Sequence, residues 1–254
     1  FNKKEWALIL KYAKKSKDVW IEVCDTFSVQ IIKENIDIIS GLKLQSSVLQ
    51  DIEIIQQLEK LNLENIILIV NISGIEIDDI LKIEENFKSK INPEEIVFQI
   101  GFQDYPTETK NCGLQKIKIL KNNFKNRISY ADHSDGKSVE AVYLPILSLY
   151  YGAIIIEKHI MHSKKKTLYD YFSSININQY HEYFLQSEHY FNSNSLPLEC
   201  AEIDKSFEKE NFINNKEKKY LTSTLHFPIS KRDLDKGSLI SLKNDISFKR
   251  TNQN

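Results

Sequence analysis

The chain has 254 residues, of which 41% are hydrophobic and 27% are charged, and its formal net charge is −1. This length suits one full-sized hydrophobic core with a small appendage, and the balanced charge gives no electrostatic reason to expect nucleic acid or a membrane surface as a partner. No apolar stretch approaches the roughly 20 residues that a membrane-spanning helix needs. The three cysteines are far apart and lack CxxC spacing, which predicts reduced thiols in a cytoplasmic protein.

Helical and strand patterns alternate from the first residues onward. In chain order, the expected elements are a helix at residues 2–16, a strand at 19–24, a helix at 29–35, a strand at 38–44, a helix at 51–61, a strand at 66–70, a helix at 77–90, a strand at 96–100, a helix at 114–123, a strand at 127–131, a helix at 139–151 and a strand at 153–158. The strands are apolar throughout, which is typical of a parallel sheet covered on both faces. Because the chain begins with Phe1 and opens on a helical pattern, we expect it to be part of a longer sequence.

The polar residues of this pattern gather at one end of the strands. Each expected strand ends in small or polar residues, whereas the joints from helix to strand carry ordinary surface residues. This arrangement favours a β/α barrel, which keeps its active site at the carboxyl ends of the strands, over a doubly wound sheet of six strands. The sequence has no GxGxxG or GxxxxGKS/T loop, which argues against nucleotide binding.

The pattern changes after His159. Residues 175–191 predict a last helix, and the helical spacing of their aromatic side chains indicates core packing rather than a sugar-stacking platform. A polar, charged stretch follows, and then short β or turn structure with a tight turn at residues 235–238. The expected parts are a barrel domain at residues 1–191, a linker at 192–219 and a C-terminal segment at 220–254.

Two histidines follow successive expected strands. His133 comes directly after one strand and His159 after the next, and a predicted helix separates them. If the strands are parallel neighbours, both imidazoles emerge at the same rim. Two imidazoles there can hold a divalent metal ion and leave positions open for water or substrate. The alternative is that each histidine is an ordinary polar residue. The occurrence of two histidines at successive strand ends favours the metal site over this alternative.

The order of these motifs resembles the N-acetylneuraminate (sialic acid) synthase family. The segments that carry the resemblance are Lys43-Leu44-Gln45-Ser46, Gly101-Phe102-Gln103-Asp104-Tyr105-Pro106-Thr107, Ala131-Asp132-His133-Ser134, Gly152-Ala153 followed by Glu157-Lys158-His159, and Asp170. Towards the end of the chain, Lys236-Gly237-Ser238-Leu239-Ile240 and Phe248-Lys249-Arg250 resemble the start of the family's antifreeze-like domain. The resemblance covers most of the chain.

The resemblance implies an α/β fold, namely the (β/α)8 TIM barrel truncated to its last six strand–helix units, with a partial antifreeze-like (SAF) segment. The first two strands, which carry an acidic residue and a Lys/Gln pair in relatives, would then be missing. It also implies a homodimer when the protein is full length, with each C-terminal domain capping the partner's barrel.

In function, the resemblance implies a transferase that condenses phosphoenolpyruvate with an N-acetylated amino-sugar aldehyde similar to N-acetylmannosamine. The products are a sialic-acid-like nonulosonic acid for surface glycans, and phosphate. It implies that His133 and His159 bind manganese, with magnesium or cobalt as alternatives, and that the ion polarises the aldehyde. Two other hypotheses stay open: a metal-dependent aldolase or isomerase on another sugar phosphate, and a degenerate, non-catalytic sugar-binding protein.

Other side chains near the strand ends are expected to bind the substrates or to support the two histidines. Lys43 is the best phosphate ligand, because an ammonium at a strand end can neutralise a phosphate, and the alternative is a solvated lysine. The other expected substrate ligands are Ser46 and Ser73 as hydroxyl donors, Gln103 and Tyr105 for phosphoenolpyruvate or sugar hydroxyls, and Asp170 for sugar hydroxyls, unless Asp170 is a disordered loop residue. Asp132 either orients His133 or caps the following helix. For Glu157 and Lys158, a buried ion pair is the structural alternative to a functional role.

Several positions depart from the family pattern. Ala131 replaces a serine before the Asp-His pair, and Val48 replaces a glutamate. The family's Cys-x-Ser segment is replaced at residues 101–103, and its Asn-Leu is Gly113-Leu114, where Asn111 lies close enough to substitute. Because these positions face the substrates in relatives, the departures indicate a divergent branch with an undefined sugar.

Overall fold

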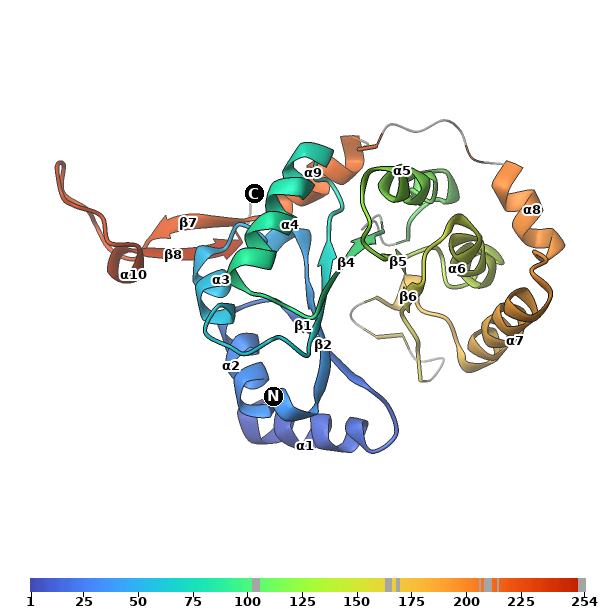
Figure 1. Ribbon diagram of the computed structural model, residues 1–254, viewed down its shortest axis with the longest axis horizontal. Helices are drawn as coiled ribbons and strands as arrows, with labels where there is room; N and C mark the ends of the chain where they lie inside the picture. Colours follow the sequence, from blue (N-terminus) through green and yellow to red (C-terminus); the bar gives the residue numbers. More distant parts are fainter. Residues whose placement is uncertain are drawn as a thin grey trace. The chain divides into compact units, whose positions relative to one another are not determined.

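The computed structural model describes residues 1–101, 106–162, 166–167, 170–205, 207, 212–213 and 215–250 (Figure 1). These residues form two compact units. Unit 1 contains residues 1–96 and 218–254, and unit 2 contains residues 97–217. Each unit is built from parallel strands that alternate with helices.

Unit 1 opens with three strands that lie side by side in chain order. Its elements are α1 (Lys3–Lys14), β1 (Val19–Val23), α2 (Thr26–Asn35), β2 (Ile39–Leu44), α3 (Ile52–Leu58), β3 (Ile67–Asn71) and α4 (Ile77–Lys90). β1 pairs with β2 and β2 pairs with β3, both in parallel. Asp25 and Asp51 start α2 and α3 by accepting hydrogen bonds from backbone N–H groups of the first helical turn.

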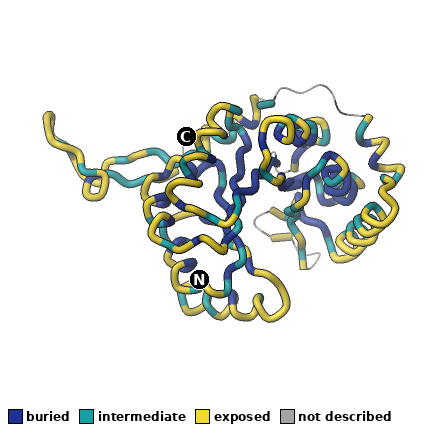
Figure 2. The backbone as a smooth tube through the Cα atoms, in the orientation of Figure 1, coloured by how far each residue is buried: buried dark blue, intermediate teal, exposed yellow. Residues whose placement is uncertain are grey.

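The strands of unit 1 have one apolar face and one face that mixes apolar and charged side chains. Side chains alternate along a strand, so residues that are paired in register share a face. Leu42 and Leu44 are fully buried and lie beside Leu68 and Val70 of β3. Glu22 of β1 is paired in register with Lys43 of β2, on the opposite face. Helices α1 and α2 pack against β1, and the strands are largely buried while the outer sides of the helices are exposed (Figure 2).

Unit 2 repeats the same arrangement. Its elements are β4 (Glu95–Ile100), whose first two residues belong to unit 1, α5 (Gln115–Asn123), β5 (Ile128–Asp132), α6 (Glu140–Tyr151), β6 (Ile155–Lys158), α7 (Ile177–Ser193) and α8 (Leu198–Lys205). β4 pairs with β5 and β5 with β6, in parallel. Helix α6 is the apolar centre of this unit, because most of its residues are buried and β5, α5, α7 and α8 all pack against it.

The C-terminal part of unit 1 is a β-hairpin. Helix α9 (Asn215–Thr224) crosses the boundary between the units and leads into β7 (His226–Ser230), which pairs antiparallel with β8 (Ile246–Arg250). Between the strands lie the short helix α10 (Leu242–Asp245) and a turn that the Ser238 N–H closes on the Asp235 carbonyl. Gly237 occupies the left-handed region in this turn, with φ +89°.

The expected fold class is confirmed. All six strands and the helices between them lie within a few residues of the expected ranges, and the strands follow chain order within each unit, which a doubly wound sheet does not do. The stretch expected to be a plain linker, residues 192–219, instead contains α8 and the start of α9. Cys200 and Ile203 are buried in α8, so tertiary packing stabilises a helix that its polar sequence did not indicate. No helix among the described residues is long and apolar enough to cross a membrane.

Candidate functional site

The two strand-end histidines meet in unit 2. His133 follows β5 and His159 follows β6, and their ring centroids lie 5.3 Å apart. His133 is buried, whereas about a third of the His159 side chain (29%) is exposed. The structure therefore brings the expected pair together at the carboxyl ends of neighbouring parallel strands.

The backbone of His133 is held from two sides. Its carbonyl accepts a hydrogen bond from the Thr107 N–H at 2.8 Å and another from the Ser173 hydroxyl at 2.9 Å. The carbonyl of His159 accepts from the Ile175 N–H at 2.9 Å. Loops after β4 and β6 thus fix both strand ends, which limits the positions open to the two imidazoles.

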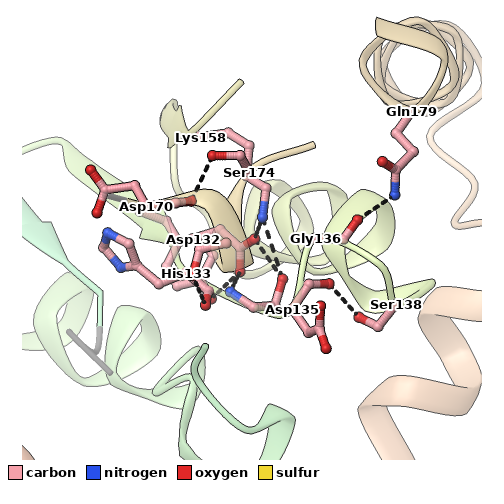
Figure 3. A network of polar contacts seen from close by, with 12 residues as sticks. Asp132, His133, Asp135, Gly136, Ser138, Lys158, Asp170, Ser174 and Gln179 are labelled. Atoms are coloured by element: carbon pink, nitrogen blue, oxygen red, sulfur yellow. Dashed lines mark hydrogen bonds and ion pairs between the residues drawn. The ribbon is translucent and has the colours of Figure 1, made fainter. Parts of the chain in front are cut away.

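Asp132 and Lys158 form a buried ion pair on the opposite face of the same two strands (Figure 3). Asp132 also accepts hydrogen bonds from the Ser134 hydroxyl at 2.7 Å and the Tyr130 hydroxyl at 3.3 Å. Burial first, and then the neighbouring Cys112 and Asp132, raise the pKa of Tyr130, so this phenol stays a donor. Asp132 does not cap α6, because the N-cap of that helix is Val139. Its carboxylate binds Lys158, Ser134 and Tyr130, and the expected role in orienting His133 stays a prediction.

Asp170 lies beside the histidine pair. One of its carboxylate oxygens (Oδ2) is 3.9 Å from His159 Nδ1, and the residue adopts a left-handed conformation with φ 56°. The Ser174 hydroxyl donates to the Asp170 carbonyl at 2.6 Å, and this contact helps to hold the unusual backbone. The loop at residues 135–138 joins the same network, because the Gly136 carbonyl accepts from Gln179 of α7 (Figure 3).

A second polar group lies on the histidine face. Gln99 of β4 is fully buried, and its amide nitrogen donates to Ser129 Oγ and to Glu157 Oε2, each at 3.1 Å. Alternation along β5 and β6 places Ser129 and Glu157 on the same face as the two histidines. The amide oxygen of Gln99 is buried and has no hydrogen-bond partner within the described part of the chain. Gln99 was not expected as a site residue, because nothing in the sequence distinguishes its strand position.

The expected phosphate ligand, Lys43, lies on the face of the unit 1 strands that also holds Glu22. Lys43 is buried, with 7% of the residue exposed, and its Nζ lies 3.0 Å from Glu22 Oε2. Lys43 is therefore not the solvated lysine that was the alternative. Glu22 also accepts from the Cys24 thiol at 3.6 Å. Burial, followed by the negative charge of Glu22, raises the pKa of Cys24 to about 11, so that this thiol is protonated at neutral pH.

The remaining strand ends of unit 1 are also ordered by polar contacts. The Asn71 amide donates to Gln45 Oε1 at 3.1 Å, and Asn71 Oδ1 accepts from the Ser73 N–H at 2.9 Å. Ser46 and Ser73 are both buried at these ends. The structure thus places Lys43, Ser46 and Ser73 in unit 1, and His133, His159 and Asp170 in unit 2.

Of the three remaining expected substrate ligands, the structure describes only Asn111. Asn111 is in a short turn after β4 and donates to Glu108 Oε2 at 3.0 Å. Gln103 and Tyr105 lie outside the described residues. Their expected roles stay predictions.

The spacing of the two imidazoles is compatible with a shared divalent metal ion. With ring centroids 5.3 Å apart, one nitrogen from each imidazole can approach a common point. No group of three or more His, Cys, Asp or Glu side chains that could hold a metal ion occurs among the described residues. A site with two protein ligands would leave several coordination positions for oxygen atoms of a substrate or of water.

Parallel strand–helix units in chain order, with polar side chains at the strand ends, define a protein of the TIM-barrel class. The chain belongs to the NeuB family, whose model matches residues 2–193. It is 34% identical over 87 residues to a pseudaminic acid synthase of Campylobacter jejuni, a match that covers 34% of this chain and 24% of that relative. It is 27% identical over 187 residues to an uncharacterized protein of Methanocaldococcus jannaschii, covering 73% of this chain and 49% of the relative. The chain thus spans about half or less of the curated relatives that it matches.

Solved structures share the fold. The spore coat polysaccharide biosynthesis protein SpsE of Bacillus subtilis superposes with a TM-score of 0.77 at 19% identity, over 97% of this chain and 67% of that structure. N-acetylneuraminic acid synthetase of Leptospira borgpetersenii, solved with citrate, superposes with a TM-score of 0.65 at 21% identity, over 83% of this chain and 73% of that structure. At these identities the likeness supports the fold assignment alone.

Proposed function

We propose that this chain supplies most of the catalytic barrel of a sugar-acid synthase that condenses phosphoenolpyruvate with an N-acetylated amino-sugar aldehyde. The observation that carries the proposal is the contact between His133 and His159 at two neighbouring strand ends. Membership of the NeuB family and the partial match to a protein named pseudaminic acid synthase support it.

In the proposed reaction, the methylene carbon of phosphoenolpyruvate forms a bond with the aldehyde carbon of the sugar. Water adds to the neighbouring carbon, and the resulting intermediate expels phosphate. His133 and His159 would hold the divalent ion, and the chemistry that such an ion supplies when bound is polarisation of an aldehyde oxygen. Two nitrogen donors disfavour magnesium, which prefers oxygen ligands, so manganese or cobalt suits this pair better.

The other side chains have binding roles in this proposal. Lys43 would attract the phosphate of phosphoenolpyruvate, because its ammonium is a compact positive charge at a strand end. Asp170 would accept hydrogen bonds from sugar hydroxyls beside His159. Ser46 and Ser73 would donate hydroxyl hydrogen bonds, and Glu157 would hold or move a proton on the histidine face.

The test uses the full-length protein with phosphoenolpyruvate, N-acetylmannosamine and related amino sugars, and manganese. We expect phosphate release only when both substrates and the ion are present. The double variant His133→Ala/His159→Ala should lose manganese binding in calorimetry, whereas His189→Ala, on the exposed part of α7, should keep it. Unchanged manganese affinity in the double variant would refute the site.

Two outcomes would point to other functions. Turnover of a sugar phosphate without phosphoenolpyruvate would favour a metal-dependent aldolase or isomerase. Binding of metal and sugar without phosphate release would favour a non-catalytic sugar-binding protein.

We also propose a homodimer for the full-length protein, which sedimentation velocity would test.

A further inference from the structure

The ammonium of Lys43 has a carboxylate beside it before any substrate arrives. Glu22 and Lys43 are paired in register on the parallel strands β1 and β2, so their side chains leave the same face next to each other. Lys43 Nζ lies 3.0 Å from Glu22 Oε2, and the Lys43 side chain is 8% exposed. A buried ammonium requires a counter-charge, and Glu22 supplies it.

Glu22 differs from Lys43 in its freedom to move. Its side chain is 38% exposed, so it can rotate into solvent without leaving a buried cavity. Its second carboxylate oxygen accepts a hydrogen bond from the Cys24 thiol, and this contact is also at the exposed side of the strand end. The carboxylate is therefore held on Lys43 by contacts that water can replace.

We propose that Glu22 is an internal competitor for the anionic substrate: its carboxylate binds Lys43 in the resting protein, and an incoming phosphate group displaces it. The inference rests on the proposed function for Lys43 as an anion ligand and for the identity of the anion as phosphoenolpyruvate. The physical basis is that two negative groups within a few ångströms of one ammonium repel each other, so both cannot keep full contact with it. Glu22 thereby lowers the affinity of this subsite for every anion.

The test replaces Glu22 by its neutral isostere, Glu22→Gln, in the full-length protein. Affinities for phosphoenolpyruvate and for inorganic phosphate are measured separately by calorimetry. We expect both affinities to rise roughly tenfold, with an increase that shrinks at high salt because the repulsion is electrostatic. In the assay for phosphate release, KM for phosphoenolpyruvate should fall while kcat changes little.

Two controls isolate the effect. Glu34→Gln changes the net charge of the chain by the same amount, but Glu34 belongs to helix α2 and pairs with Lys3, so anion affinity should stay at the wild-type value. Lys43→Met should abolish anion binding at this subsite. Because Glu22→Gln removes one negative charge beside the buried Lys43 ammonium, the variant should unfold at a lower temperature, and added phosphate should raise that temperature more than in the wild type.

The outcomes separate this inference from the proposed function. If folded Glu22→Gln protein binds phosphoenolpyruvate and phosphate no more tightly than the wild type, the competition is refuted and the proposed function is unaffected. If Glu22→Gln binds inorganic phosphate more tightly than the wild type but neither protein binds phosphoenolpyruvate, the competition is supported and the proposed function fails.

Discussion

Adjacent residues at the carboxyl end of β5 point to opposite faces of the sheet. Asp132 forms a buried ion pair with Lys158 of β6, whereas His133, one residue further, contacts His159 on the other side. Because the residues of both pairs come from the same two strand ends, the ion pair fixes the spacing of the strands that carry the histidines. Positioning of the two histidines therefore explains why the charged side chains of Asp132 and Lys158 are buried, although burial of charges is costly.

Breaking this ion pair should be costly. We expect Lys158→Met or Asp132→Asn alone to lower the free energy of unfolding by about 3–5 kcal/mol, since each leaves an uncompensated buried charge. The double variant should lose less than either single variant, because neither charge remains. Urea unfolding measures all three, and losses that simply add would contradict the coupling.

Replacing Gln99 should affect activity more than stability. Its amide nitrogen binds Glu157 and Ser129, but its buried amide oxygen has no partner among the described residues. We expect Gln99→Leu to change the free energy of unfolding by only about 1 kcal/mol, because the lost hydrogen bonds are offset by removal of the unsatisfied oxygen. If Glu157 acts in the reaction, phosphate release should nevertheless fall about tenfold.

The matched control is Ser129→Ala, which removes one hydrogen-bond partner of Gln99 and leaves its contact with Glu157. Activity should then stay near the wild-type level. Equal losses of activity in the two variants would indicate a packing defect rather than a misplaced Glu157 carboxylate.

The raised pKa of Cys24 predicts how the alkylation rate of this thiol depends on pH. Its pKa of about 11 means that only about one thiol in a thousand is ionised at pH 8, and the thiolate is the reactive form. Although part of Cys24 is exposed, the desolvated thiol should be alkylated slowly by iodoacetamide at pH 8, and the rate should rise about tenfold per pH unit up to that pKa. In Glu22→Gln the pKa should fall, and mass spectrometry should detect faster labelling at pH 8. Rapid labelling of the wild type at pH 7 would contradict this environment.

At the scale of elements, the C-terminal hairpin is tied to helix α3. His226 Nδ1 of β7 lies 2.7 Å from Asp51 Oδ2, and Asp51 also accepts the N–H of Ile54 as the N-cap of α3. One carboxylate therefore starts a helix and holds a strand. A pocket of about 280 Å³, lined by Gln56, Leu242 and Phe248 among others, lies between α3 and the hairpin.

We expect Asp51→Ala to destabilise unit 1 by about 2 kcal/mol, because it removes both the helix cap and the contact with the histidine. His226→Phe should keep the ring volume and lose only the contact. Hydrogen exchange should then accelerate in β7 and β8 for both variants, but in the first turn of α3 for Asp51→Ala alone. Faster exchange of α3 in His226→Phe would show that the two elements are not separable in this way.

The elements were predictable because apolar periodicity is strong in strands buried on both faces. Helix α4, expected at residues 77–90, has these bounds in the structure. Helix α8 was not predictable, because it has only 8 residues, lies in a polar and charged stretch, and depends on contacts with α6. The histidine pair was predictable for a local reason, since both residues directly follow apolar strands. The partners of Lys43 and Asp132 were not, because they lie on neighbouring strands and follow only from the register.

At the scale of the whole molecule, binding of a metal ion should increase the stability of the folded chain against unfolding. An ion that binds the folded chain at His133 and His159 but not the unfolded chain stabilises it by about 2.7 kcal/mol at a free concentration of 100 times Kd. We therefore expect manganese to raise the unfolding temperature and a chelator to lower it again. The increase should vanish in the double variant His133→Ala/His159→Ala, and an equal increase in that variant would place the binding elsewhere.

The contact between Trp20 and Gly41 has a practical consequence. A side chain larger than hydrogen at position 41 would collide with the Trp20 ring, because a Cβ there would lie 2.2 Å from it. The indole therefore rests on the backbone of β2, on the same strand face as Glu22 and Lys43. The chain has one other tryptophan, Trp6, which packs against Phe1. In a Trp6→Phe background, emission from Trp20 would provide a built-in optical reporter of anion arrival, readable in a stopped-flow instrument without any attached dye.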